Sequence, residues 1–242
     1  TVIEAEYRDG TRERYVLPLA MSSGADAERV EREHPGAVVA RVTGARKGLL
    51  YDGLFDDTTC TMLLGSIREG RVLATRQGRL EAMPLGLALD NISADALTPI
   101  ARTAPDQSNT SVLFGQRLIL KLFRRFEPGP NPDVEIGMFL TERRFPNVPA
   151  TTGAIEYRLD DGETMHVAIL QEFIESQGDA WTYTLDAVSR FFENALAGSV
   201  PDPVEPRLLE LAAEPPVAQA QELIGAYLES ARLLGQRTAE MH

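Results

Sequence analysis

Two short apolar runs separated by a glycine-containing turn stand near the middle of the 242-residue chain. Residues 112–114 form the first run, Gly115 and Gln116 form the turn, and residues 118–123 form the second run. Short apolar runs on either side of such a turn are typical of a β-hairpin. The second run is interrupted only by Lys121, and an ammonium group in a buried strand is unfavourable without a partner. The pattern therefore predicts a hairpin whose second strand carries a lysine that needs an anion.

A helix is expected to follow this hairpin. Asn131, Pro132 and Asp133 form a typical helix start, because proline suits the first helical turn. Glu135 lies in that turn, and a strand, a loop and a helix can bring its carboxylate back over Lys121. In kinase small lobes, a strand lysine paired with a helix glutamate holds the α- and β-phosphates of ATP. The alternative is that the lysine extends to solvent and the glutamate is simply hydrated.

The remaining pattern predicts an α+β chain that begins with strands and ends with helices. Apolar runs bounded by turn residues predict strands within residues 2–7, 14–19, 38–42, 48–53, 71–89, 154–158 and 165–173. Helical spacing of apolar residues predicts helices at residues 56–67, with Asp57 or Thr58 as N-cap, at 186–196 and at 218–242. The run 166–174 is long and apolar, which favours a central strand, whereas the polar segment 22–36 is expected to be a loop.

Composition narrows the class of protein. The formal net charge of −12 and the sequence pI near 4.8 argue against a nucleic-acid-binding protein, which presents a basic face. The single cysteine, Cys60, excludes an intrachain disulfide and fits a reducing compartment. His34, His166 and His242 have no metal-ligand spacing. No apolar run approaches the ~20 residues of a membrane helix, and no signal segment opens the chain, so a soluble cytoplasmic protein is expected.

The block 107–137 resembles the corresponding part of bacterial maltokinases, and it is the most specific part of a similarity that spreads over most of the chain. The similarity continues through residues 145–149, 170–173 and 178–181. The opening residues 7–19 are similar to the cap subdomain that precedes the kinase in that family. In many bacteria this kinase is fused behind a trehalose synthase domain. The absence of an initial methionine and a final helix without a stop signal suggest a piece of a longer protein.

The resemblance implies a protein-kinase-like fold that uses ATP and Mg²⁺ to convert maltose to maltose 1-phosphate. Residues 1–97 would be the strand-rich cap, 98–180 the small lobe and 181–242 the helical start of a truncated large lobe. Lys121 would bind phosphate with Glu135 as its helix partner. The phosphate-covering loop would be Ser108, Asn109, Thr110 and Ser111, which lack the glycine-rich form but offer N–H and hydroxyl groups. The hinge whose backbone receives adenine would be Gln171, Glu172, Phe173 and Ile174.

The chain also departs from the family, because it lacks the His-Gly-Asp-like catalytic segment and the later Asp-Phe-Glu-like metal segment. Phosphoryl transfer requires metal ligands and a base for the sugar hydroxyl, so no transfer activity and no metal ligand are expected in this piece. Maltose binding would need the missing large lobe. Two alternatives stay open. One is a non-catalytic module that assembles with a trehalose synthase domain or a second subunit. The other is a small-molecule kinase of the aminoglycoside or choline type, against which the cap and the connector 127–133 speak.

Overall fold

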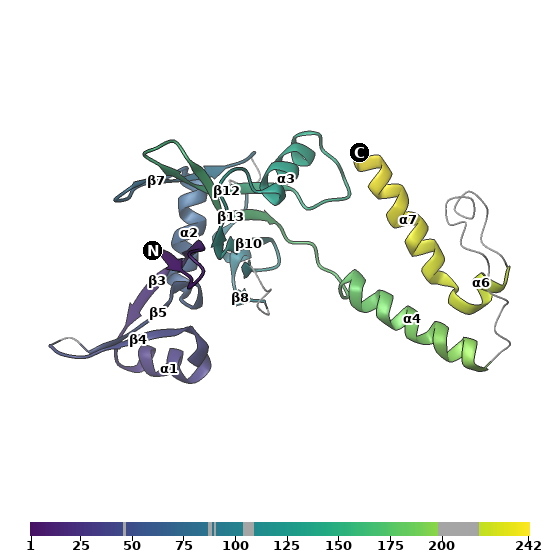
Figure 1. Cartoon of the computed structure of the whole chain (residues 1–242), viewed down its shortest axis with the longest axis horizontal. Coiled ribbons are helices and arrows are strands. Elements are labelled where there is room, and N and C mark those ends of the chain that lie inside the picture. The colour runs from purple at the N-terminus through teal and green to yellow at the C-terminus, as the bar shows by residue number, and fades with distance from the viewer. Residues whose placement is uncertain (46, 87–88, 90, 104–108, 198–217) are drawn as a thin grey trace. The chain divides into compact units, whose positions relative to one another are not determined.

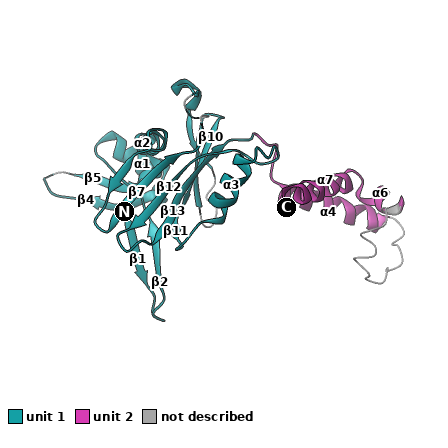
Figure 2. Ribbon diagram, turned by 90° about the horizontal axis from the view of Figure 1, so that it is seen from above, with its two compact units in different colours: residues 1–174 teal, residues 175–242 magenta. Residues whose placement is uncertain are grey.

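The computed structural model describes residues 1–45, 47–86, 89, 91–103, 109–197 and 218–242. Two compact units make up these residues, one spanning Thr1–Ile174 and the other Glu175–His242 (Figure 2). Among the described residues, no helix combines the length and the apolar character that crossing a membrane requires.

A seven-stranded antiparallel sheet organises the first unit, with strand order β6-β7-β12-β13-β10-β9-β8 (Figure 1). Its strands are β6 (Val72–Ala74), β7 (Gly78–Pro84), β8 (Ile100–Arg102), β9 (Asn109–Phe114), β10 (Leu118–Phe123), β12 (Thr151–Leu159) and β13 (Thr164–Glu172). β13 takes the central position, as its long apolar run predicts. The boundary predicted at residue 97 falls inside this sheet, because β6 and β7 come from the segment expected to be the cap.

The predicted hairpin at the centre of the chain is confirmed, since β9 and β10 pair in antiparallel register across Gly115. Gly115 has a φ of +56°, and a Cβ there would lie 2.1 Å from the carbonyl oxygen of Ala96. The turn therefore requires glycine both for its left-handed backbone and for its close approach to the preceding segment.

Two helices cover opposite faces of the large sheet. α2 (Asp57–Glu69) packs Leu64 and Ile67 into the larger apolar cluster, and α3 (Pro132–Glu142) packs Val134 into a second cluster on the other side. The N-cap of α2 is Asp56, one residue before the predicted Asp57, because its side chain accepts the main-chain N–H of Thr59. α3 begins as predicted, with Asn131 as its N-cap.

Two smaller sheets come mostly from the N-terminal part of the chain. One has the order β1-β2-β11 and the other β3-β5-β4. Their strands are β1 (Val2–Glu6), β2 (Arg12–Val16), β3 (Leu19–Ser22), β4 (Val38–Val42), β5 (Gly48–Asp52) and β11 (Arg125–Phe126). Short 3-10 helices lie at Pro35–Ala37, Gly53–Phe55 and Ala94–Leu97.

The prediction of a loop at residues 22–36 is wrong, because this segment contains helix α1 (Ala25–Glu33). α1 fully buries only Val30, which packs with Leu49 and Tyr51 of β5. Val30 is the only large apolar residue of this short and mostly charged helix, so its low apolar content concealed it.

The described residues of the second unit are mainly helical, as predicted, and form α4 (Ala180–Ala197), α6 (Ala218–Ile224) and α7 (Ala226–Met241). The rings of Tyr183 and Tyr227 lie 5.8 Å apart, and the Thr184 hydroxyl lies 3.1 Å from the Tyr227 hydroxyl. The single helix expected at residues 218–242 is interrupted at Gly225, whose φ is +50°.

Candidate functional site

Lys121 lies on the face of the large sheet that α3 covers. Side chains alternate along a strand, and the buried leucines of β10 join the cluster beneath α2. Lys121 therefore shares the opposite face with Phe123, which packs in the cluster containing Val134 of α3. The lysine predicted to stand inside a strand is thus directed toward the helix predicted to accompany it.

The immediate neighbours of Lys121 are one hydroxyl and one aliphatic side chain. Its cross-strand partners are Ser111 in β9 and Ile169 in β13. Ile169 is fully buried, whereas Lys121 and Ser111 are partly buried. Among the described residues, the ammonium group of Lys121 has no hydrogen bond and no ion pair. Its side chain is therefore partly buried without a carboxylate partner in the described part of the chain.

Glu135 does not form the predicted ion pair with Lys121, since no carboxylate of a described residue lies within 4 Å of that ammonium group. Val134 and Met138 occupy the sheet-facing stripe of α3, and Glu135 is exposed beside it. Burial lowers the pKa of His166, and the charges of Glu156 and Glu135 partly oppose that shift.

The segment predicted to cover the phosphates is divided between the two faces of the sheet. Asn109 and Ser111 pair with Phe123 and Lys121 of β10 and so lie on the α3 face. Thr110 lies on the opposite face, where its hydroxyl accepts a hydrogen bond of 2.9 Å from Nε of Arg124. Ser108 lies outside the described residues. The structure thus places two of the four predicted residues on the face of Lys121 and directs Thr110 away from it.

The predicted hinge begins at the end of β13. Gln171 lies beneath α3, where a Cβ on Gly137 would come 3.7 Å from its Nε2. The main-chain N–H groups of Glu172 and Phe173 are already donated to the carbonyl oxygens of Ala150 and Arg117, at 2.9 and 2.8 Å. Those two amides are therefore not free to bind a base.

Ile174 follows these two residues, and its side chain is exposed. Its amide has no hydrogen-bond partner among the described residues. Main-chain recognition of an adenine in this linker would therefore begin at Ile174, the last of the four predicted hinge residues.

The sequence carries a further signal for Lys121 that motif reading misses. Lys121 is one of only two lysines in a chain with 24 Lys and Arg residues. The other, Lys47, is exposed in the connection between β4 and β5. A compact ammonium on a flexible stem differs from a planar guanidinium, so Lys121 is not equivalent to the arginines of the chain.

A cavity of about 360 Å³ lies on the α3 face next to this cluster. Phe123, Asn109 and His166 contribute from the strands, and Asn131 and Asp133 contribute from the start of α3. This volume is within the range of small-molecule sites. Phe123 lies two residues after Lys121 on the same face of β10. The cavity is therefore next to Lys121 along this strand.

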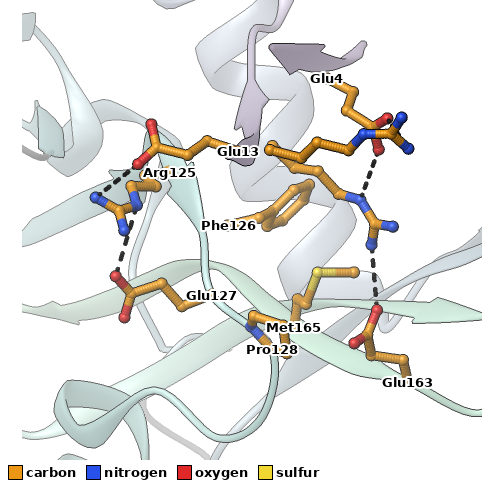
Figure 3. Close-up of a pocket in the computed structure, with 10 residues that line it drawn as sticks. Glu4, Glu13, Arg125, Phe126, Glu127, Pro128, Glu163 and Met165 are labelled. Atoms are coloured by element: carbon orange, nitrogen blue, oxygen red, sulfur yellow. Dashed lines mark hydrogen bonds and ion pairs between the residues drawn. The ribbon is translucent and has the colours of Figure 1, made fainter. Parts of the chain in front are cut away.

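A larger cavity of about 520 Å³ lies against the sheet β1-β2-β11 and differs in its electrostatics (Figure 3). Arg14 bridges Glu4 at 3.3 Å and Glu163 at 3.1 Å (Figure 3). Arg125 lies 3.2 Å from Glu13 and 3.8 Å from a second carboxylate, that of Glu127. The arginines here are neutralised by carboxylates of the same cavity, which connects the β1–β2 hairpin to the start of β13. This cavity is consequently lined by ion pairs within the protein, whereas the ammonium group of Lys121 has no ion pair among the described residues.

Within the described part of the chain, no three His, Cys, Asp or Glu side chains come together in a group able to hold a metal ion. No Mg²⁺ ligand is therefore assigned to these residues.

Comparison with known proteins gives limited similarity. No protein-family model matches the chain. Among solved structures, a glucosamine kinase in complex with glucosamine, ADP and inorganic phosphate matches with a TM-score of 0.45 and 16% identity, over 81% of this chain and 40% of that one. Two further glucosamine kinase structures, crystal forms A and B, match with TM-scores of 0.43 and 0.36 and identities of 16% and 15%.

The match to crystal form A covers 77% of this chain and 35% of that one, and the match to form B covers 75% and 38%. The chain thus spans well under half the length of the proteins it matches.

Proposed function

We propose that the seven-stranded sheet and α3 form the nucleotide-phosphate-binding part of an ATP-dependent sugar kinase and that Lys121 contacts the phosphates. The observation that carries this proposal is the partly buried side chain of Lys121 on the α3 face of β10, whose ammonium group has no ion-pair partner among the described residues. An unpaired buried cation lowers stability unless a ligand supplies the anion. Ser111 and Asn109 stand on the same face and add a hydroxyl and an amide, which are suitable donors to phosphate oxygens.

The second part of the proposal concerns the sugar that accepts the phosphate. The resemblance of residues 107–137 to bacterial maltokinases favours maltose, with transfer to its reducing end to give maltose 1-phosphate. Mg²⁺ and the base for the sugar hydroxyl would come from residues outside the cluster around Lys121. A trehalose synthase domain or subunit is the partner that the same resemblance favours.

The two lysines of the chain provide the test. Lys121→Met removes the ammonium from the α3 face, and Lys47→Met is the matched control on an exposed turn. ATP binding by each variant is measured by calorimetric titration. We expect Lys121→Met to weaken ATP binding by roughly 10- to 100-fold, the value of one charge-assisted contact, and Lys47→Met to leave it unchanged.

Thermal unfolding of the same proteins without nucleotide gives an independent readout. A methionine at position 121 would relieve an unpaired cation on an apolar face, so its melting temperature is expected to equal or exceed that of the wild type. Equal ATP binding by Lys121→Met and the wild type would refute the role of Lys121. No ATP binding by the wild-type chain would favour the interaction-module alternative.

A further inference from the structure

His166 of β13 contacts the residue that starts α3. The main-chain N–H of Asn131, the N-cap residue, donates to Nδ1 of His166 at 3.1 Å. On the other side of the ring, Nε2 lies 3.9 Å from Oε2 of Glu156. The imidazole side chain is only 12% exposed. A ring nitrogen that accepts a hydrogen bond carries no proton, so this contact is available only to the neutral ring with its proton on Nε2.

We propose that neutral His166 is a positioning residue that holds the N-terminus of α3 on the sheet, and that protonation of its ring releases that contact. In the imidazolium both nitrogens are donors, and Nδ1–H would then face the donor N–H of Asn131. The amide would lose its acceptor and would face a second N–H donor, which disfavours the contact.

The segment leading into α3 makes the His166 contact important for the position of the helix. Residues 127–132 contain three prolines, which have no N–H to donate. Apart from Asn131, this connector is attached to the sheet by the N–H of Gly129, which donates to the carbonyl oxygen of Thr164 at 2.9 Å. The side chain of Asn131 accepts the N–H of Asp133 and therefore caps the helix without anchoring it to a strand. The His166 contact supplies that anchor.

The charged side chains near His166 lie on β12, on α3, on β11 and in the segment that follows β11. Glu156 faces it from β12 and Glu135 acts on it from α3, and both stabilise the imidazolium. Asp133 of α3 lines the same cavity, as do Arg125 of β11 and Glu127 after it. Burial of the ring opposes the carboxylates and is the larger effect, so the pKa of His166 lies below its ordinary value of 6.5.

The direction of the pH effect follows from that shift. Between the lowered folded-state pKa of His166 and its ordinary value, the unfolded chain binds more protons than the folded chain. The contribution of His166 to stability is therefore complete above about pH 6.5 and decreases as the pH falls toward the folded-state pKa. Release of α3 within the folded protein is expected at lower pH, around and below the folded-state pKa, where the ring of the folded protein itself gains the proton.

Two variants of His166 distinguish the effect of its hydrogen-bond acceptor from the effect of its protonation. In His166→Asn, the side-chain oxygen occupies the place of Nδ1 and can accept the N–H of Asn131, but it does not titrate. In His166→Phe, the ring is kept and the acceptor is lost. The readout is amide hydrogen exchange of residues 134–140, compared with the core of α2 in the same sample and corrected for the intrinsic pH dependence of exchange.

For the wild type, we expect the protection of α3 relative to α2 to fall by about 10-fold between about pH 7.5 and about pH 5, which corresponds to the loss of one hydrogen bond. His166→Asn should keep the protection of α3 at both pH values, and His166→Phe should show reduced protection at both. The proposal is overturned if α3 and α2 of the wild type change in parallel, or if His166→Asn shows the same loss on acidification. If His166→Phe does not fold, the comparison of wild type with His166→Asn decides the matter.

The consequence for ATP rests on the proposed function, because Glu135 belongs to the released turn and lies on the face of Lys121. ATP binding is therefore measured at the same two pH values for the wild type and His166→Asn. A larger loss of affinity at low pH in the wild type is expected. The exchange experiment contains no nucleotide, so its outcome judges the His166 contact alone. A positive exchange result with no ATP binding would refute the proposed function and leave the contact intact.

Discussion

The guanidinium of Arg124 donates a hydrogen bond to the carboxylate of Asp52, which lies 72 residues earlier in the chain. The side chains are 22% and 12% exposed, so the ion pair is largely withdrawn from water. Arg124 directly follows β10, and its carbonyl oxygen accepts the N–H of Val16 at 2.8 Å. Its Nε also donates to Thr110 of β9. One residue thus connects both small N-terminal sheets to the strands that carry Lys121 and Ser111.

Loss of the Asp52–Arg124 ion pair should destabilise the first unit strongly. Asp52→Asn keeps a side-chain oxygen for the N–H of Leu54, which Asp52 accepts at 3.0 Å, but leaves Arg124 without a counter-charge. We expect a loss of about 2 to 3 kcal/mol in the free energy of unfolding, measured by urea denaturation. The control is Glu6→Gln, which breaks an exposed pair with Arg12 at 3.0 Å and should change stability by less than about 1 kcal/mol. Equal effects of the two variants would contradict the structural role of Arg124.

Gly137 and Gly65 provide matched helix substitutions with opposite expected signs. A Cβ on Gly137 in α3 would lie 2.6 Å from Oγ1 of Thr151, which is buried in β12, whereas a Cβ on Gly65 in α2 meets nothing within 4 Å. Alanine favours a helix over glycine by about 1 kcal/mol, so Gly65→Ala should stabilise the protein. Gly137→Ala should instead destabilise it by about 1 to 2 kcal/mol, because α3 must move away from the sheet.

Thr151 supplies the check on this explanation. Thr151→Ala removes Oγ1, the atom that a Cβ on Gly137 would contact too closely. Gly137→Ala should therefore cost less stability in the Thr151→Ala background than in the wild type. The four proteins of this cycle are compared by urea denaturation. Strictly additive effects would show that the contact between Gly137 and Thr151 does not limit the approach of α3.

Cys60 should be inert to thiol reagents in the folded protein. Its thiol is completely buried in α2 and donates to the carbonyl oxygen of Leu54 at 3.3 Å. Burial raises the pKa of Cys60 to about 11, although the neighbouring guanidinium of Arg102 opposes the shift. At about pH 8 the folded protein should therefore show no labelling by a disulfide reagent on the timescale in which the urea-unfolded protein reacts completely. Rapid labelling of the folded protein would show that α2 opens or that the thiol is exposed.

Local signals in the sequence predicted much of the fold. The hairpin at Gly115, the N-cap at Asn131 and the central position of β13 all followed from a few neighbouring residues. Each depends on turn geometry, capping or the length of an apolar run, and these properties are contained within one short segment. The same reasoning failed at residues 25–33, because this short helix is mostly charged and Val30 is its only large apolar residue.

The sequence by itself determined that Lys121 stands in a strand and that Glu135 stands in the first turn of the next helix. Only the tertiary structure decided where their charges are directed. The register of β9 on β10 places Ser111 beside Lys121 and sends Thr110 to the other face. The packing of Val134 against the sheet leaves Glu135 exposed and without an ion pair to Lys121. Register and helix rotation are set by contacts between residues far apart in the chain, so no single segment contains the information that fixes them.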